Sequence, residues 1–390
     1  MMTALLLALA TVALVVSALE VYAVVSHLSK GPRQLPNGFK PRISVLKPLC
    51  GRDASLAENL TSFLRQEGVA YEVLLGVRDA TDAAYPLACA LQQQFPDRVK
   101  VVLQEGEPGV NPKVNQLVTL AKHAEGEVLV ISDSNVRVPP NYLADLVAPL
   151  ADAEVGMVTS PIAGEPGANL GGQLDALHLH TFITPSVIGS KLVARQDLFI
   201  GKSMAFRRAD LDALGGFRAF ARVLAEDHAL GRAMLKAGKT AALARVPVVN
   251  VTDATLKQTF DRYARWGLMQ RWIAGPGYPA QLLTFPIVLA IAAAIGARHV
   301  PMALLAAVGV GVGKIVIDGV AIHALTRRMP TLRELMLAPL KELVTFGAFL
   351  KAMTSNVVAW RGNRFYVTRG TRLMRPEVRA RLLQLRHAHR

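Results

Sequence analysis

The sequence predicts an α/β protein in which a doubly wound, mostly parallel sheet is combined with helices in or on a membrane. Three observations support this fold class. Short β-branched and apolar runs alternate with helical stretches between residues 41 and 159. Long apolar stretches lie near both ends of the 390-residue chain. Hydrophobic residues make up 52% of the chain and its mean hydropathy is +0.31, which is too apolar for an ordinary soluble enzyme.

The first apolar stretch, residues 1–25, is long enough to cross a hydrocarbon core of about 30 Å. No basic residue precedes it and no clear cleavage site follows it, which argues against a secretory signal. Basic residues follow it instead, at Lys30, Arg33 and Lys40. The positive-inside rule therefore predicts a transmembrane helix over residues 1–26, with the N-terminus outside and the next part of the chain in the cytosol.

Five strands and four helices are expected next, within one α/β domain over residues 40–255. The strands are 43–46, 71–77, 99–103, 128–131 and 155–159, and the helices are 55–65, 83–94, 113–123 and 142–150. Strands that alternate with helices form parallel βαβ units. The two cysteines, Cys50 and Cys89, have no zinc-like spacing and suit a reducing compartment.

The last third of the chain is expected to return to the membrane. Residues 256–278 are predicted to form an interfacial helix, because tryptophans flank its arginines. Residues 279–360 are predicted to be membrane segments: 281–297 and 300–325 can each span, whereas 335–360 contains charges and is expected to be re-entrant or interfacial.

Residues 361–390 form a basic tail that contributes to the formal net charge of +15. A basic segment beside apolar ones favours anionic lipid headgroups as its partner, and no nucleic acid is expected. By the positive-inside rule the tail is predicted to be cytosolic.

Two polar residues, Asp133 and Asn135, follow the predicted strand 128–131. In open α/β sheets, ligands bind outside the carboxyl ends of the strands. Alternate residues of an extended segment share a face, so both side chains can point at one divalent cation. The same pattern also occurs in plain loops, and these residues alone leave both interpretations open.

Two further positions have similar double interpretations. Asp79 follows the second predicted strand, where it can hydrogen-bond the base or ribose of a nucleoside, or act as a helix N-cap or turn residue. Lys113 opens a helix after a loop rich in Gly and Pro, where it can meet a phosphate or remain a solvated surface lysine.

The densest polar cluster lies between residues 199 and 241 and includes Glu226 and Asp227. This pair either caps a helix or sets two carboxylates against each other, so that one becomes a usable base. Arg262 and Arg265 are three residues apart, so on a helix both guanidinium groups face one way. Trp266 beside them suits a membrane interface, a catalytic site, or both.

Taken in order, these residues resemble the inverting glycosyltransferases with a GT-A fold. More narrowly, the chain resembles glycosyltransferase family 21, the ceramide glucosyltransferase family, which shows a D, D, D, (Q/R)xxRW series. The resemblance spans residues 40–275 and extends to these pieces: Leu-Lys-Pro-Leu at 46–49, Gly-Val-Arg-Asp at 76–79, Asn-Pro-Lys-Val at 111–114, Asp-Ser-Asn-Val-Arg at 133–137, Ala-Glu-Asp at 225–227 and Trp-Arg-Gly-Asn-Arg at 360–364.

The resemblance implies a Rossmann-like GT-A domain that takes a hexose from a UDP-sugar, expected to be UDP-glucose. The implied acceptor is the primary hydroxyl of a ceramide-like lipid at the cytosolic face of a membrane, expected to be a bacterial inner membrane. Asp79 would hold the uridine, and Lys113 and Glu226 would belong to the donor site. Asp133 with Asn135 would hold Mg²⁺ or Mn²⁺ at the diphosphate.

The remaining roles follow from the same resemblance. Asp227 would be the general base that deprotonates the acceptor hydroxyl. Arg262 and Arg265 would stabilise the charge that grows on the leaving diphosphate, and Trp266 would line the sugar or acceptor site. Many GT-A members have Asp-x-Asp where this chain has Asn135, and an amide oxygen is a weaker ligand than a carboxylate. Low metal affinity in the absence of nucleotide is therefore expected.

Other readings share part of this pattern. A hopanoid or other lipid N-acetylglucosaminyltransferase would use the same catalytic residues, as would a polyprenyl-phosphate sugar synthase. A polysaccharide synthase would need more spans than the three predicted here. A non-catalytic, lipid-binding membrane scaffold would explain the basic tail but leave the acidic and RxxRW series as coincidence.

Overall fold

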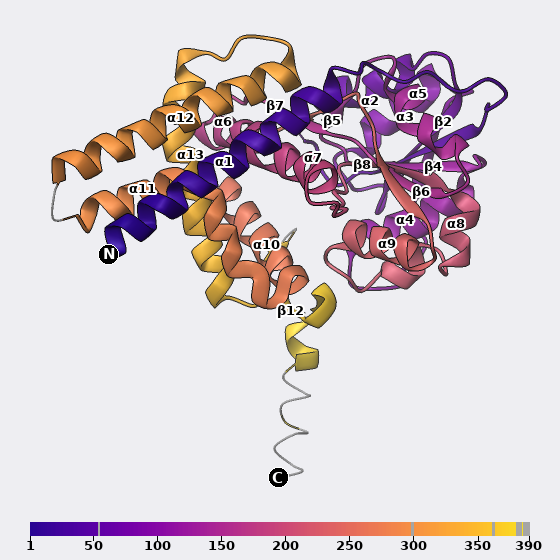
Figure 1. The fold of residues 1–390 in the computed structure, drawn as a ribbon. Helices are drawn as coiled ribbons and strands as arrows, with labels where there is room; N and C mark the ends of the chain where they lie inside the picture. Colours follow the sequence, from indigo (N-terminus) through magenta and orange to yellow (C-terminus); the bar gives the residue numbers. More distant parts are fainter. Residues whose placement is uncertain (54, 298–299, 361–362, 380–383, 385–390) are drawn as a thin grey trace. The chain divides into compact units, whose positions relative to one another are not determined.

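The computed structural model describes residues 1–53, 55–297, 300–360, 363–379 and 384 (Figure 1). The chain forms two compact units. The first, here called the helical unit, comprises Met1–Lys30, Ile162–Leu198 and Thr252–Ser355. The second, the sheet unit, comprises Gly31–Pro161, Phe199–Val251 and Asn356–Arg390. Residues 162–198 fall within the α/β region expected from the sequence, yet they pack with the helical unit.

The sheet unit is built on a seven-stranded sheet with the order β3-β2-β1-β4-β8-β6-β9. Its strands are β1 (Arg42–Pro48), β2 (Ala70–Val77), β3 (Val99–Leu103), β4 (Val128–Ser132), β6 (Val155–Thr159), β8 (Ser203–Arg207) and β9 (Thr240–Leu243). Neighbours pair in parallel except around β8, which runs antiparallel to both β4 and β6. The predicted mostly parallel α/β sheet is confirmed, and β8 and β9 are the two strands of this sheet that were not predicted from the sequence.

Helices connect these strands. They are α2 (Leu56–Ser62), α3 (Tyr85–Gln94), α4 (Pro112–His123), α5 (Tyr142–Val147), α8 (Arg208–Ala213) and α9 (Glu226–Lys236), with short 3-10 turns at Phe63–Arg65, Ala148–Ala151, Phe217–Phe220 and Arg369–Thr371. Asn111 is the N-cap of helix α4. Its side chain accepts hydrogen bonds from the backbone amides of Lys113 and Val114, and Pro112 stands at the first helical position. This cap fixes the start of the helix that carries Lys113.

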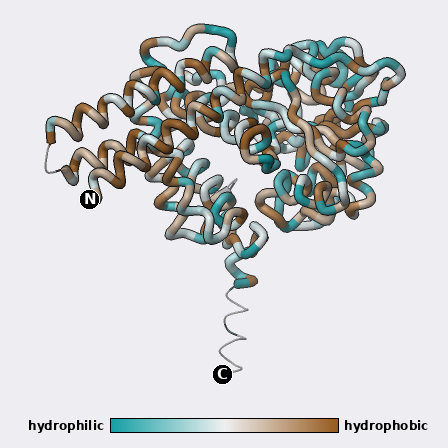
Figure 2. The backbone as a smooth tube through the Cα atoms, in the orientation of Figure 1, coloured by the Kyte–Doolittle hydropathy of each residue, from teal (hydrophilic) through white to brown (hydrophobic). Residues whose placement is uncertain are grey.

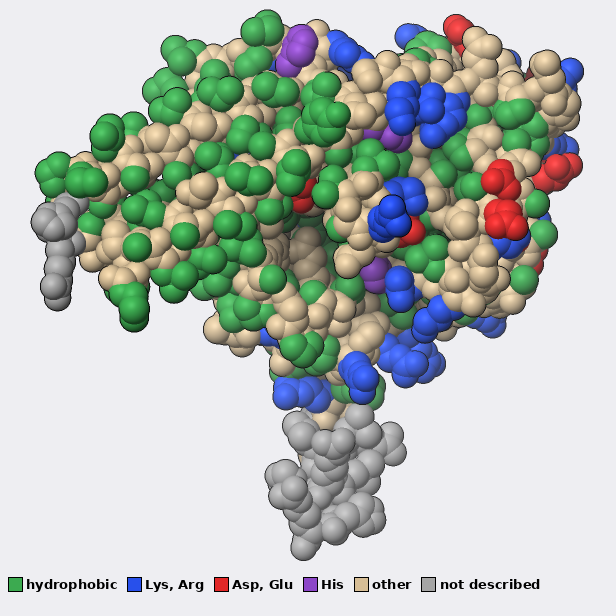
Figure 3. All heavy atoms as spheres, viewed as in Figure 1, with side chains coloured by type: hydrophobic (Ala, Val, Ile, Leu, Met, Phe, Trp, Pro, Cys, Tyr) green, Lys and Arg blue, Asp and Glu red, His purple; other side chains and the backbone are tan. Residues whose placement is uncertain are grey.

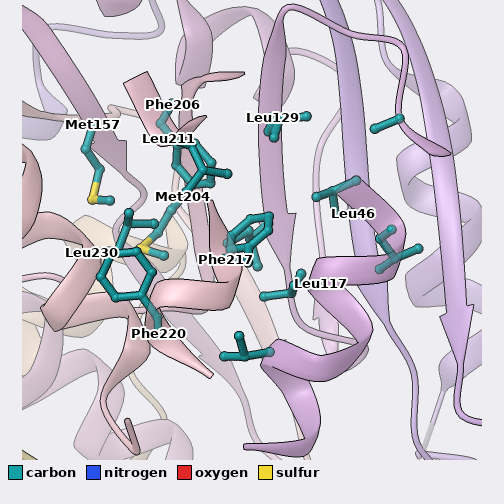
Figure 4. Packing of buried hydrophobic residues seen from close by; sticks show 14 of the residues in the cluster. Leu46, Leu117, Leu129, Met157, Met204, Phe206, Leu211, Phe217, Phe220 and Leu230 are labelled. Carbon is teal, nitrogen blue, oxygen red and sulfur yellow. The ribbon is translucent and has the colours of Figure 1, made fainter. Parts of the chain in front are cut away.

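The core of the sheet unit is a buried hydrophobic cluster on one side of the sheet (Figure 4). Leu46 and Leu129 come from adjacent strands, Leu117 comes from α4, and Phe206 and Phe217 meet edge to face with ring centroids 5.9 Å apart. Burial of apolar side chains of this size contributes about 1.5–3 kcal/mol each. The cluster therefore fixes β4, β8 and α4, whose ends carry the polar residues of interest.

Two small sheets complete this unit. Strand β5 (Val136–Arg137) pairs antiparallel with β10 (Val248–Val251). Strands β11 (Val357–Trp360), β12 (Asn363–Thr368) and β13 (Arg372–Met374) form an antiparallel sheet. The amide of Leu373 donates to the carbonyl of Arg222 at 2.9 Å, so the first part of the expected basic tail is folded structure. The rest of that tail, at residues 361–362, 380–383 and 385–390, lies outside the described residues.

The helical unit contains the apolar segments. Its elements are α1 (Met2–Leu28), β7 (Ile162–Glu165), α6 (Leu170–His178), a π-helical turn (Leu179–Ile183), α7 (Thr184–Leu192), α10 (Leu256–Ala274), a 3-10 segment (Gly275–Thr284), α11 (Pro286–Ile295), α12 (Val300–Thr326) and α13 (Leu332–Thr354). Among the described residues, α1 and α12 are each long and apolar enough to cross a membrane. The hydrophobic colouring of both helices is plain in Figure 2.

The expected span over 281–297 is not one straight helix. Leu256–Thr284 and Pro286–Ile295 are bent by 72° relative to each other, and the pair could form one broken span or a re-entrant loop. Prolines explain the break, since Pro279 and Pro286 each lack a backbone N–H donor. Helix α13 is not among the spanning candidates of the described residues, and the re-entrant or interfacial placement of 335–360 stays a prediction.

Candidate active site

The carboxyl end of β4 places Asp133 between lysine side chains from two other elements. Lys113 at the start of α4 lies with Nζ 2.9 Å from Oδ1 of Asp133 and 3.1 Å from Oε1 of Glu226 at the start of α9. The same ammonium donates to the carbonyl of Gly201 at 3.3 Å. The ammonium of Lys113 therefore connects Asp133, Gly201 and Glu226, which lie far apart in the sequence.

Lys202 makes the second pairing of Asp133. Its Nζ lies 3.2 Å from Oδ2 of Asp133 and 3.0 Å from Oδ1 of Asn135. The two oxygens that the sequence predicts as metal ligands thus converge on one positive group. Lys47, buried over the Phe63 ring at 3.7 Å, donates to the backbone carbonyl of Asp133 at 2.7 Å.

Asp227 is held by backbone amides. Its Oδ2 accepts from the amide of Gly201 at 2.5 Å, and its Oδ1 accepts from the amide of His228 at 2.7 Å. A Cβ at position 201 would lie 2.9 Å from Oδ2 of Asp227, so a larger residue there would displace this carboxylate. The carboxylate is therefore fixed in orientation, and its oxygens keep lone pairs for a further hydrogen bond.

Burial and charge act in opposite directions on these carboxyls. Burial alone would raise the pKa of Asp133, but Lys113 and Lys202 outweigh it and leave that pKa well below its usual range. Burial raises the pKa of both Glu226 and Asp227, against the opposing charge of Lys113. The acids therefore divide into one that stays ionised, Asp133, and two that are easier to protonate, Glu226 and Asp227.

Asp79 lies at the same carboxyl edge, since β2 and β4 both run parallel to β1. Its exposed carboxylate accepts hydrogen bonds from the amide and the hydroxyl of Thr81, and these bonds lower its pKa. This is the turn geometry that the sequence analysis weighed against nucleoside binding. Those hydrogen bonds are local, whereas Lys113, Asp133, Glu226, Asp227 and Asn135 form one connected group.

The RxxRW residues lie on α10, in the helical unit. Nη1 of Arg262 lies 3.0 Å from Oδ2 of the buried Asp175 on α6, and its Nη2 donates to the Thr252 hydroxyl at 3.3 Å. The Tyr263 hydroxyl donates to the other oxygen of Asp175 at 2.6 Å. Trp266 meets the Tyr263 ring edge to face.

Several of these residues were not among the predicted site. Lys202 and Lys47 had no assigned role, although Gly201-Lys202-Ser203 lies within the polar cluster at residues 199–241. Asp175 lies in a segment for which the sequence analysis predicted no element. The only sequence feature that could have pointed to Lys202 is its place next to Gly201 in the polar cluster. Its contact with Asp133 could not be predicted, because it depends on the pairing of β8 with β4.

A divalent cation fits this site only in part. Among the described residues, no group of three or more His, Cys, Asp and Glu side chains is arranged to hold a metal. The ammonium of Lys202 nevertheless shows that Asp133 and Asn135 present two oxygens to one cation. Oxygen ligands of this kind suit Mg²⁺ or Mn²⁺, with the rest of the shell left to other donors.

The fold is that of the GT-A glycosyltransferases. A mannosyltransferase from Pyrobaculum calidifontis, solved with GDP-Man and Mn²⁺, superposes with a TM-score of 0.54 at 20% identity, covering 91% of this chain and 99% of that one.

The chain belongs to glycosyl transferase family 21, whose model matches residues 5–373. Ceramide glucosyltransferase 1 from Caenorhabditis elegans is 27% identical over 239 residues, which cover 59% of this chain and 50% of that protein. Ceramide glucosyltransferase 3 from the same organism is 23% identical over 359 residues, covering 86% of this chain and 75% of the relative. The match thus spans half the length of the first of these relatives.

Proposed function

We propose that this protein is a membrane-bound inverting glycosyltransferase that moves a hexose from a UDP-sugar to a lipid. The proposed donor is UDP-glucose, and the proposed acceptor is the primary hydroxyl of a ceramide-like lipid at the cytosolic membrane surface. Family membership, the GT-A fold and the candidate spanning helices support a glycosyltransferase with a lipid acceptor. A membrane anchor suits such an acceptor, because a lipid leaves the bilayer only at high cost.

The observation that carries the proposal is the state of Asp227. Two backbone amides fix this carboxylate, and burial raises its pKa toward the range of a working base. In the proposed reaction, Asp227 accepts the proton of the acceptor hydroxyl. The hydroxyl oxygen attacks the anomeric carbon from the face opposite the diphosphate, and the bond to UDP breaks as the new glycosidic bond forms.

The donor site is proposed at the carboxyl edge of the sheet. Lys113 and Glu226 would contact the donor, and Asp79 would hold the uridine. Asp133 and Asn135 would hold a divalent cation, whose chemistry when bound is to neutralise the leaving diphosphate. Lys113 lies close enough to this place to add a further positive charge.

In the helical unit, Arg262 is committed to Asp175. We propose that Arg262 fixes α10, and that Arg265 and Trp266 keep the roles the family resemblance implies for the diphosphate and for the sugar or acceptor. The folded and tail segments after residue 361 are proposed to bind anionic lipid headgroups.

Transfer assays on purified protein test this function. Radiolabelled UDP-glucose, UDP-galactose and UDP-N-acetylglucosamine are each supplied with ceramide in mixed micelles. We expect labelled glycolipid from UDP-glucose and little from the other two donors. Transfer from UDP-N-acetylglucosamine to a hopanoid, with none to ceramide, would replace the proposed donor and acceptor. No transfer from any donor to ceramide or to a total lipid extract would contradict the proposal itself.

A further inference from the structure

We infer that Lys202 is a built-in counter-cation that competes with a divalent metal for Asp133 and Asn135, so that the metal binds well only when a nucleotide diphosphate is present. The identity of the nucleotide rests on the proposed function, whereas the competition rests on the contacts of Lys202 alone.

The ammonium of Lys202 occupies the place where these two ligands converge. It lies 3.2 Å from Oδ2 of Asp133 and 3.0 Å from Oδ1 of Asn135, and the lysine side chain is 12% exposed. The other oxygen of Asp133 is already paired with Lys113. Both carboxylate oxygens of the only acidic ligand are therefore engaged by lysines within the described structure.

The amide of Asn135 is oriented for this contact. Its Nδ2 donates to Oδ1 of the buried Asn250 at 3.0 Å, which leaves its Oδ1 facing Lys202. A backbone hydrogen bond also holds Asn135 in place, since the amide of Val251 at the end of β10 donates to the carbonyl of Asn135 at 2.8 Å. Asn135 is thus held as an oxygen donor toward a cation.

The placement of Lys202 also follows from the sheet. Ser203 pairs with Ser132 where β8 meets β4, and the amide of Asp133 donates to the carbonyl of Lys202 at 3.2 Å. The lysine backbone is therefore fixed beside Asp133. Its four-carbon side chain remains able to turn, so the ammonium can move while the backbone stays in place.

Competition between cations explains why metal and nucleotide should bind together. Three lysines, Lys47, Lys113 and Lys202, surround Asp133, and the other nearby acids are Asp53, Glu226 and Asp227. Because lysines already pair with both oxygens of Asp133, a divalent ion alone must displace an ammonium to reach them. A diphosphate brings compensating negative charge, and its oxygens give the ammonium of Lys202 a new partner. Displacement of Lys202 then frees Oδ2 of Asp133 and Oδ1 of Asn135.

The test is a Mn²⁺ titration of full-length protein in detergent, with and without UDP, followed by electron paramagnetic resonance of free Mn²⁺. Lys202→Met should tighten Mn²⁺ binding without UDP by at least about tenfold, since the resident charge is gone. UDP should tighten Mn²⁺ binding strongly in the wild type and much less in Lys202→Met. Lys202→Arg keeps the charge and should bind Mn²⁺ weakly without UDP.

Lys100→Met is the matched control, since Lys100 is an exposed lysine on β3 of the same unit, and it should leave both titrations unchanged. Equal Mn²⁺ affinity of Lys202→Met and wild type, without UDP, would overturn the inference. If Lys202→Met fails to fold, the wild type still decides, because an absence of coupling between Mn²⁺ and UDP contradicts the competition. None of these readouts requires sugar transfer, so a failure of the proposed reaction remains distinguishable from a failure of this inference.

Discussion

Asp227 is the residue on which the proposed chemistry depends most directly. Asp227→Asn should lower kcat/KM for transfer by about 100-fold or more, because an amide cannot accept the acceptor's proton. UDP binding, measured by calorimetry, should change little, since the proposed role is that of a base and not of a donor ligand. Asp97→Asn, at an exposed position of the same unit, is the control. Transfer within about tenfold of wild type would remove Asp227 as the base.

The pH dependence of kcat/KM for transfer should depend on the positive charge of Lys113. A base works deprotonated, so a raised pKa at Asp227 moves the acid limb of kcat/KM above the ordinary aspartate value of about 3.9. Lys113 opposes that rise, and Lys113→Met should therefore move the acid limb to still higher pH. Loss of donor affinity would lower the whole profile but leave the position of the limb readable. An unchanged or lower limb would contradict the coupling.

The sequence located part of this site for a clear reason. Asp133, Lys113 and Glu226 each stand at the end of an element whose type is readable from local pattern, and parallel strands bring such ends to one edge. Lys202 could not be placed this way. Its contact with Asp133 requires the antiparallel pairing of β8 with β4, and no local feature of the five-residue strand reveals that pairing.

At the scale of elements, strand and helix periodicity predicted five strands of the sheet closely, whereas β8 and β9 were not predicted. For example, β3 was expected at 99–103 and is observed at Val99–Leu103. The breaks in the helical unit were harder to predict. Apolar composition made 281–297 look like one span, whereas Pro279 and Pro286 divide the region into a 3-10 segment and a helix of 10 residues. Hydropathy measures composition and does not detect such a change of direction.

The attachment of α10 to α6 gives a prediction at this scale. Asp175→Asn removes the charge that pairs with Arg262 and should destabilise the helical unit by about 3–5 kcal/mol, since a buried pair loses one partner. Thermal unfolding in detergent measures this as a clear fall in Tm. Asp261 lies on α10, next to Arg262, and pairs with Lys257 and Lys351 in more exposed positions. Asp261→Asn breaks these pairs and should cost less than about 1 kcal/mol. Equal effects of the two variants would contradict the anchoring role of Asp175.

At the scale of the whole molecule, the outer faces of α1 and α12 are apolar. Leu5 and Val12 on α1 are 59% and 48% exposed, and Leu305 and Val316 on α12 are 75% and 60% exposed. Figure 3 shows hydrophobic side chains spread over these helices, with few charged groups among them. Apolar faces of this extent require a covering, and their hydropathy and 27-residue lengths favour lipid.

The membrane topology depends on whether the bent pair formed by Leu256–Thr284 and α11 crosses. If α1, the bent pair and α12 all cross, an outside N-terminus places the C-terminal segment in the cytosol, on the same side as the sheet unit. If the bent pair does not cross, the C-terminal segment would lie outside, which conflicts with its place in the sheet unit, where the amide of Leu373 donates to the carbonyl of Arg222. The positive-inside rule favours three crossings, because Arg327, Arg328 and Arg333 directly follow α12.

Labelling of intact cells with a membrane-impermeant maleimide decides between these topologies. The exposed Cys50 reports the sheet unit, and Val378→Cys and Ile295→Cys, each made with Cys50→Ser and Cys89→Ser, report the C-terminal segment and the end of α11. We expect Ile295→Cys to be labelled in intact cells, and Cys50 and Val378→Cys only after permeabilisation. If Val378→Cys is labelled from outside while Ile295→Cys is protected, the bent pair is re-entrant and the chain crosses twice. If both are labelled from outside, the chain crosses once more after α12, and α13 would have to provide that crossing despite its charged residues.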